Sequence, residues 1–158
     1  MKKQFQRLLA LGIFLLCLSV RAAPLAVGDA VPAIVANDQH GVAFQFTNGI
    51  RFLLVVTEMA ASKSANQKLA AAGAGFLEQH HAACLMDIHT MPAIARVFAL
   101  PKLRKHPHRI VLVDAADALA AFPAQPHRVT VLALTPAGRV GKISYWDPAG
   151  EPVAEFLK

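Results

Sequence analysis

RFLLVVTEMAASKSANQKLAAAGAGFLEQHHAACLMDI, residues 51–88, is the stretch that decides the fold. Its first part, Arg51–Thr57, is a near-continuous apolar run, which is typical of a strand covered on both faces. A helix follows, with Ser62 as its expected cap. The apolar stripe of this helix consists of Ala65, Leu69, Ala72 and Phe76. Ala82–Ile88 is the next apolar run, so the stretch predicts a strand, a helix and a second buried strand.

The segments on either side predict further strands and helices. Val42–Phe46 alternates as a short strand. Gly73 and Gly75 are expected to interrupt the first helix. Pro92 opens a second helix that we expect to end at Pro101. One apolar face of this second helix is formed by Met91, Ile94, Val97 and Phe98.

The C-terminal half continues the alternation. Arg109–Val113 has the pattern of a strand and Asp114–Phe122 that of a short helix. Val129–Leu134 and Arg139–Tyr145 are expected strands, which the turn Thr135–Gly138 joins into a hairpin. A final helical turn is indicated by Val153, Phe156 and Leu157.

The composition fits a single folded domain. The chain has 158 residues, of which 55% are hydrophobic and 16% charged, so it is long enough for one core and too apolar for intrinsic disorder. Strands that alternate with helices predict an α/β fold. We expect one domain over residues 23–158, with a central mixed sheet, helices on both faces, a terminal hairpin and a C-terminal helix.

The net charge of +6 does not indicate a nucleic-acid partner. Four of the sixteen basic residues, Lys2, Lys3, Arg7 and Arg21, lie in the first 22 positions, which contain no acidic residue. The remainder carries twelve basic and ten acidic residues, a net charge of only +2. That balance is ordinary for a soluble domain.

Residues 1–22 have the pattern of a secretion signal. A basic start precedes the apolar run 8–20, which is shorter than the roughly 20 residues that a spanning helix needs. We expect cleavage after Ala22, a periplasmic or secreted domain, and membrane contact only during export. Two alternatives stay open: an uncleaved anchor, and a lipidated Cys17, although Leu16 precedes it where a small residue is needed.

Cysteine usage restricts the chemistry. Cleavage after Ala22 removes Cys17, so the mature chain keeps only Cys84 and cannot form an internal disulfide. No C-x-x-C is present. Cys84 is therefore either a buried small hydrophobe or a reactive thiol.

Several segments resemble the thioredoxin-like superfamily, in its thiol–disulfide oxidoreductase and peroxiredoxin branch. VGDAVPAIVANDQHGVAF (27–44) is similar to the opening segment, HRIVLVDAADALAAF (108–122) to the inserted strand and helix, and VTVLALTPAGRVGKI (129–143) to the terminal hairpin. TEMAASK, MDIHTMP and FALPKLR resemble a group of small uncharacterised exported bacterial proteins that lack the C-x-x-C. The resemblance implies a thioredoxin-like fold and an ancestral redox role.

The chain departs from the redox pattern of that superfamily. Ala61 and Ser64 stand where the resemblance would place the C-x-x-C, at a helix N-terminus that stabilises a thiolate. Val129 stands where it would place a cis-proline, and Pro126 lies three residues early. We therefore expect no dithiol–disulfide exchange and assign no catalytic residue.

The vacated position suggests a binding loop. We expect the loop after strand 51–57 to lie at the carboxyl end of the sheet, where α/β proteins bind ligands. Ser62 and the free helix amides would receive an anion there, with Lys63 beside them. The candidate ligand or partner residues are Glu58, Met59, Ser62, Lys63, Asp87 and His89. In the simpler alternative, Ser62 only caps the helix and Glu58 is solvated.

Two other clusters contain side chains of metal-binding types. Cys84, Met86, His89 and Met91 include soft ligands suited to Cu(I), although Cys84 and Met86 share a strand face and fit a core equally well. Asp87 is expected on the opposite face. Lys102–Arg109 is a basic run that fits an acidic partner or, more simply, a solvated loop, and His106 and His108 alone are too few for a metal site.

The leading hypothesis is an exported binding or accessory module without a redox dithiol, whose ligand is an unknown protein or small molecule. We expect no metal and no cofactor: a flavin or nucleotide G-x-G-x-x-G and a hydrolase G-x-S-x-G are both absent. One alternative is an antioxidant or thiol enzyme that uses Cys84. A copper-binding carrier is the third.

Overall fold

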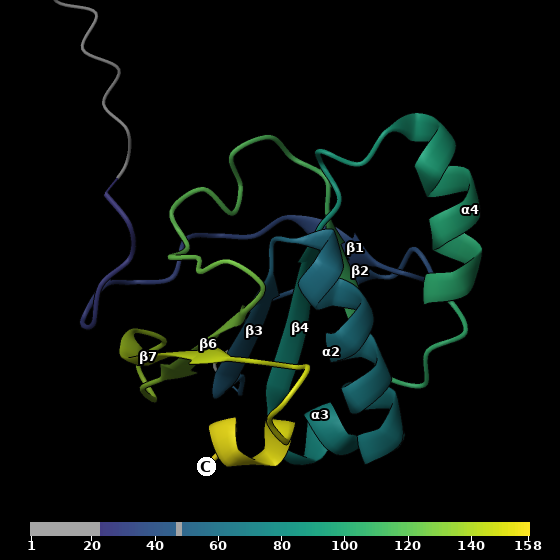
Figure 1. The fold of residues 1–158 in the computed structure, drawn as a ribbon. Helices are drawn as coiled ribbons and strands as arrows, with labels where there is room; N and C mark the ends of the chain where they lie inside the picture. The colour runs from purple at the N-terminus through teal and green to yellow at the C-terminus, as the bar shows by residue number, and fades with distance from the viewer. Residues whose placement is uncertain (1–22, 47–48) are drawn as a thin grey trace, which may run out of the picture.

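The computed structural model describes residues 23–46 and 49–158 (Figure 1). The predicted signal peptide, residues 1–22, lies outside the described residues. None of the helices within the described ranges is both long enough and apolar enough to cross a bilayer.

A seven-stranded mixed sheet forms the centre of the domain. Its order is β2-β1-β5-β4-β3-β6-β7. The central strands β3, β4 and β5 run parallel, and the remaining neighbours pair antiparallel. The strands are β1 (Ala36–Asp38), β2 (Ala43–Phe44), β3 (Phe52–Val56), β4 (Ala82–Asp87), β5 (Ile110–Val113), β6 (Val129–Leu134) and β7 (Val140–Trp146).

The strand–helix–strand unit predicted from residues 51–88 is confirmed. All five residues of β3 are buried, which matches its continuous apolar sequence. β3 pairs in parallel with β4, with Leu54 opposite Cys84. Helix α2 (Met59–Ala72) connects them, and Gly73 ends it with a φ of 102° that other residues rarely adopt. The chain then enters the short helix α3 (Phe76–Gln79).

The helices lie on one face of the sheet. α2, α3, α4 (Ala93–Leu103) and the 3-10 helix η1 (Val153–Phe156) all contact the face that carries Leu54, Cys84 and Ile110. In Figure 1, α2 runs down beside β4, and α4 stands on the other side of α2. The expected terminal hairpin and C-terminal helical turn are both present.

The second face differs from the sequence expectation. The predicted helix at Asp114–Phe122 is a series of turns, in which Asp117 has a φ of 59° that an α-helix does not accommodate. Leu119 and Phe122 nevertheless pack on this face, together with Ile34 from the N-terminal segment. Within the described ranges, irregular segments rather than helices therefore cover the second face.

The buried face of α4 also differs from the apolar stripe predicted for this helix. The core side of α4 consists of Ala95, Ala99, Leu100 and Leu103. The three predicted core residues of the helix, Ile94, Val97 and Phe98, are 65–69% exposed. Met91 is buried but precedes the first turn, so its position did not set the phase of the helix. Pro101 lies inside α4 rather than ending it.

Candidate functional site

A cavity of about 580 Å³ lies between α2 and α4, and we call it the α2–α4 groove. Met86 of β4 contributes to its lining between the two helices. The other apolar lining residues are Met59, Ala60, Met91, Ala99 and Leu103. The polar lining residues are Ser62, Lys63, Asn66, Gln67, Lys102 and His106. Met86, Met91 and Leu103 are buried in the groove beside the buried polar side chains of Ser62 and Asn66, whereas both lysines and Met59 are exposed.

The groove adjoins the first turns of α2, directly after β3. This is the place where the resemblance would put a C-x-x-C, and Ala61 and Ser64 stand there instead. Ala61 is buried in the core rather than turned toward the groove. Cys84, the one cysteine within the described ranges, is a free thiol in the same core cluster. No thiol therefore lines the groove.

Ser62 does not cap α2, contrary to the sequence prediction. The helix begins at Met59, and Glu58 occupies the N-cap without a side-chain hydrogen bond to the helix. Ser62 lies one turn inside, 6% exposed, and its Oγ donates to the Met86 sulfur at 3.5 Å. A hydroxyl that lines a cavity and donates only to a thioether is weakly satisfied.

A chain of buried polar groups leads from the groove into the interior. Asn66 Nδ2 donates to Ser62 Oγ at 3.4 Å, and His108 Nε2 donates to Asn66 Oδ1 at 3.0 Å. The exposed fraction of His108 is only 2%. Burial, with a smaller contribution from His106, lowers the pKa of His108 to about 4. The ring is therefore neutral at pH 7, and its Nδ1 has no hydrogen-bond partner within the described part of the chain.

The basic run 102–109 is exposed at all four of its lysines and arginines, as expected for a solvated segment, but Leu103 and His108 anchor it in the interior. Gln39, itself 3% exposed, accepts a hydrogen bond from Ile110 N and donates to His108 O at 2.8 Å. Arg104 Nε donates to the Gln39 carbonyl at 3.0 Å. This anchoring places His106 at the groove, and burial lowers the pKa of its ring. Sequence reasoning missed Gln39 and Asn66 because single amides carry no motif.

Arg96 holds the start of α4. Its guanidinium donates to the carbonyls of Ile88, His89 and Met91 at 2.9–3.1 Å. It also pairs with Asp114 at 2.6 Å. These contacts tie the loop between β4 and α4 to the end of β5, and so they fix where the α4 wall of the groove begins.

The structure divides the predicted ligand loop among three places. Met59, Ser62 and Lys63 line the α2–α4 groove. Glu58 accepts a hydrogen bond from His127 N at 2.9 Å, away from the groove lining. Asp87 and His89 line a separate cavity of about 300 Å³, where Asp87 Oδ1 accepts from His89 N at 2.8 Å. His89 Nδ1 is 3.0 Å from Asp114 O. The six residues therefore do not form one site.

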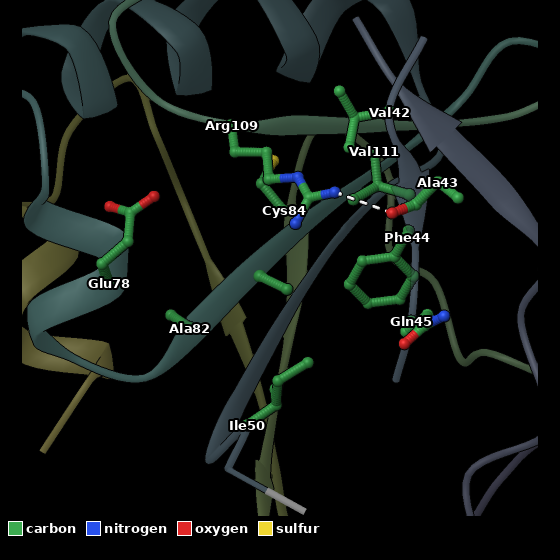
Figure 2. Close-up of a pocket in the computed structure, with 11 residues that line it drawn as sticks. Val42, Ala43, Phe44, Gln45, Ile50, Glu78, Ala82, Cys84, Arg109 and Val111 are labelled. Carbon is green, nitrogen blue, oxygen red and sulfur yellow. Dashed lines mark hydrogen bonds between the residues drawn. The ribbon is translucent and has the colours of Figure 1, made fainter. Parts of the chain in front are cut away.

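Cys84 is a buried residue, 1% exposed. Burial raises the pKa of its thiol to about 12. Cys84 also contributes to the lining of a further cavity of about 410 Å³. Figure 2 shows Arg109 beside this cavity, with its Nη2 donating to Ala43 O at 3.0 Å. Arg109 also pairs with Asp38 at 3.0 Å.

The soft ligands on which the copper-carrier alternative depends are not brought together. Met86 and Met91 line the α2–α4 groove, whereas His89 lines the separate 300 Å³ cavity and Cys84 lies in the core cluster. Among residues 23–46 and 49–158, no group of three or more His, Cys, Asp or Glu side chains is placed to hold a metal ion.

Comparisons with solved structures identify the fold. No family model and no curated protein sequence matches the chain. Among solved structures, the thioredoxin domain of a thiol-disulfide oxidoreductase from Bacteroides vulgatus is 15% identical with a TM-score of 0.57, covering 85% of this chain and 99% of that one.

Two further structures give the same result. A peroxiredoxin-like protein from Aquifex aeolicus is 12% identical with a TM-score of 0.59, over 87% of this chain and 86% of that one. A peroxidoxin from Mycobacterium tuberculosis is 11% identical with a TM-score of 0.55, over 84% and 94%. At these identities the likeness concerns architecture alone. The chain therefore has the thioredoxin-like fold.

Proposed function

We propose that this chain is a thioredoxin-like binding module that works without dithiol chemistry, and that the α2–α4 groove is its ligand site. The observation that carries the proposal is the groove itself. A cavity of about 580 Å³ that is lined by both apolar and polar side chains adjoins the position where the C-x-x-C would lie, and no thiol lines it.

The state of Cys84 supports binding over thiol catalysis. A nucleophilic cysteine needs an exposed or polar environment that lowers its pKa. Cys84 has the opposite environment, because it packs among apolar side chains that raise its pKa to about 12. The one-cysteine antioxidant is therefore the weaker candidate, and the scattered soft ligands give the copper carrier no assembled site.

Export of this module is part of the proposal and rests on the sequence of residues 1–22. Expression of the full chain in a Gram-negative host would test it. We expect the periplasmic fraction to contain a form that begins at Ala23, as read by N-terminal sequencing. Recovery of the uncut chain in the membrane or cytoplasm would contradict this part alone.

Ligand-detected NMR with a mixed library of anionic, neutral and cationic small molecules would test binding in the groove. Ala60→Trp places an indole in the groove, and Ala71→Trp is the matched control, because Ala71 is an exposed residue of α2 outside the lining. We expect compounds that bind wild type and Ala71→Trp but not Ala60→Trp. Equal binding to all three proteins, or none to wild type, would overturn the assignment.

A disulfide-reduction assay on insulin tests the chemical part. With dithiothreitol as the reductant, we expect no acceleration above background, because no thiol lines the groove. Turnover that is lost in Cys84→Ala would instead establish the thiol enzyme.

A further inference from the structure

The methionines of the chain gather at the groove. The sequence contains four methionines, one of which is Met1. The other three, Met59, Met86 and Met91, all line the α2–α4 groove, although they come from α2, β4 and the loop before α4. Unbranched thioether side chains adapt their shape to an apolar partner. Met86 and Met91 are buried in the groove, and Met59 is 61% exposed. Together they offer a hydrocarbon body of variable shape an apolar surface that extends from the base of the groove to solvent.

The charged lining residues of the groove have one sign. Lys63 projects from α2 and Lys102 from α4, so a cation stands on each wall. No aspartate or glutamate is among the lining residues. Neither lysine takes part in an ion pair in the described part of the chain. Two unneutralised ammonium groups beside an apolar cavity favour a ligand with a negative charge.

The buried polar chain supplies a further hydrogen-bond donor to the same groove. Ser62 Oγ lines the groove and donates only to the Met86 sulfur, a weak acceptor. A carboxylate oxygen in the groove would accept that proton in a stronger, charge-assisted hydrogen bond. Asn66 Nδ2 donates to the same Oγ and so leaves the hydroxyl hydrogen free to point elsewhere. His108 in turn fixes the orientation of Asn66.

We infer that the ligand of the α2–α4 groove is a small organic monoanion with an apolar body, such as a medium-chain carboxylate. The hydrocarbon part lies against Met59, Met86 and Met91, and the carboxylate lies toward Lys63, Lys102 and the Ser62 hydroxyl. The volume of about 580 Å³ is in the usual range for small-molecule sites. This inference rests on the proposed function and names the ligand class of the same site.

Titration calorimetry with four probes tests the ligand class. Octanoate carries the anion and the chain, octylammonium reverses the charge, 1-octanol removes it, and acetate removes the chain. We expect octanoate to bind at least about tenfold more tightly than octylammonium or 1-octanol, and acetate to show no measurable binding. Raising the salt concentration should weaken octanoate binding, because the lysines are on the exposed rim.

Variants assign the effect to the groove. The double variant Lys63→Gln/Lys102→Gln should weaken octanoate binding about tenfold or more and leave 1-octanol binding unchanged. Lys68→Gln is the matched control, because Lys68 is an exposed lysine of α2 outside the groove lining. The single variant Ser62→Ala should also weaken octanoate binding, because it removes the hydroxyl donor. Circular dichroism establishes that each variant is folded.

Each contrary outcome has a separate meaning. Octylammonium or 1-octanol binding as tightly as octanoate, blocked by Ala60→Trp, overturns the anion class and leaves the groove as a binding site. An equal loss in Lys68→Gln and in the double variant also overturns the inference, because the effect is then general surface charge. No binding of octanoate overturns it too, and the mixed library then decides the proposed function separately.

Discussion

The pKa values of two buried residues, Cys84 and His108, differ from those of the same side chains in water, and burial is the main cause of both shifts. Burial disfavours the charged form of a group, so it raises the pKa of the thiol and lowers that of the imidazole. Each shift has a direct experimental consequence.

Cys84 should be inert in the folded protein. Its thiol is 1% exposed with a pKa of about 12, so both access and thiolate formation oppose reaction. We expect a chromogenic disulfide reagent at pH 8 to modify Cys84 at the rate of unfolding and to react at once in denaturant. Fast modification of the folded protein, with a rate that titrates below pH 8.5 or so, would contradict the buried environment.

His108 should make stability depend on pH between about 6.5 and 4. The pKa of the ring in the unfolded chain is near the ordinary histidine value of 6.5, whereas in the folded protein it is about 4. In this window the unfolded chain binds more protons, so the free energy of unfolding falls as the pH falls, by about 3 kcal/mol in total.

Urea denaturation at pH 7, 6, 5 and 4 would measure this loss. His108→Gln is the comparison, and its curve should be flatter over the same window because the titrating group is gone. A ring pKa near 6.5, measured by NMR titration of His108 in the wild-type protein, would contradict the conclusion that burial lowers this pKa.

At the scale of elements, α4 has an apolar outer face. Ile94, Val97 and Phe98 are mostly exposed, whereas Leu103 is 8% exposed and packs in the core. Replacing the first three with glutamine should change the free energy of unfolding by no more than about 0.5 kcal/mol each, as surface changes usually do. Leu103→Ala should lower it by about 2–5 kcal/mol.

Denaturation midpoints of the four variants would check this contrast. A large loss in Phe98→Gln, comparable with that of Leu103→Ala, would mean that the outer face of α4 is covered in the protein as it exists in solution.

The elements that the sequence predicted well have local signals. Arg51–Thr57 is apolar throughout, and the glycines at 73 and 75 mark the end of α2, so β3 and α2 follow from local chemistry. The turns at Asp114–Phe122 could not be predicted in this way, because Leu119 and Phe122 pack on the sheet although the backbone there is not helical. The spacing of these apolar residues indicates which side chains are buried, but it does not indicate a helical backbone.

The candidate site was predicted only in part, for a physical reason. Met59, Ser62 and Lys63 follow β3 in sequence, so their place at one end of the sheet could be inferred. His106 and Lys102 join them only because Gln39, far away in the chain, anchors the segment that carries them. That contact joins residues 69 to 71 positions apart, and no local pattern encodes it.

At the scale of the whole molecule, a single sheet links the two sides of the core. Trp146, the one tryptophan of the chain, is fully buried with the α2 side. β6 carries Val131 on that side and Leu132 on the other. Neither side can lose its packing while the sheet persists unchanged, so we expect cooperative unfolding.

Coincident transitions would establish this cooperativity. Tryptophan fluorescence reports the α2 side and far-ultraviolet circular dichroism reports the sheet and helices. We expect both to give the same urea midpoint. A fluorescence midpoint clearly below that of circular dichroism would mean that the α2 side melts separately.

The anchoring of α4 through Arg96 has a dynamic consequence. One wall of the groove, α2, follows directly from the central strand β3. The other wall, α4, relies on a few small and aliphatic contacts, on the hydrogen bonds of Arg96 at its start and on the single hydrogen bond from Arg104 to the Gln39 carbonyl at its end. Amide hydrogens of α4 should therefore exchange with deuterium earlier than those of β3, through local opening. A helix wall that opens in this way lets ligands of different widths enter the groove. Each bound ligand must then hold α4 in place, and the conformational entropy that α4 loses weakens the affinity of every such ligand.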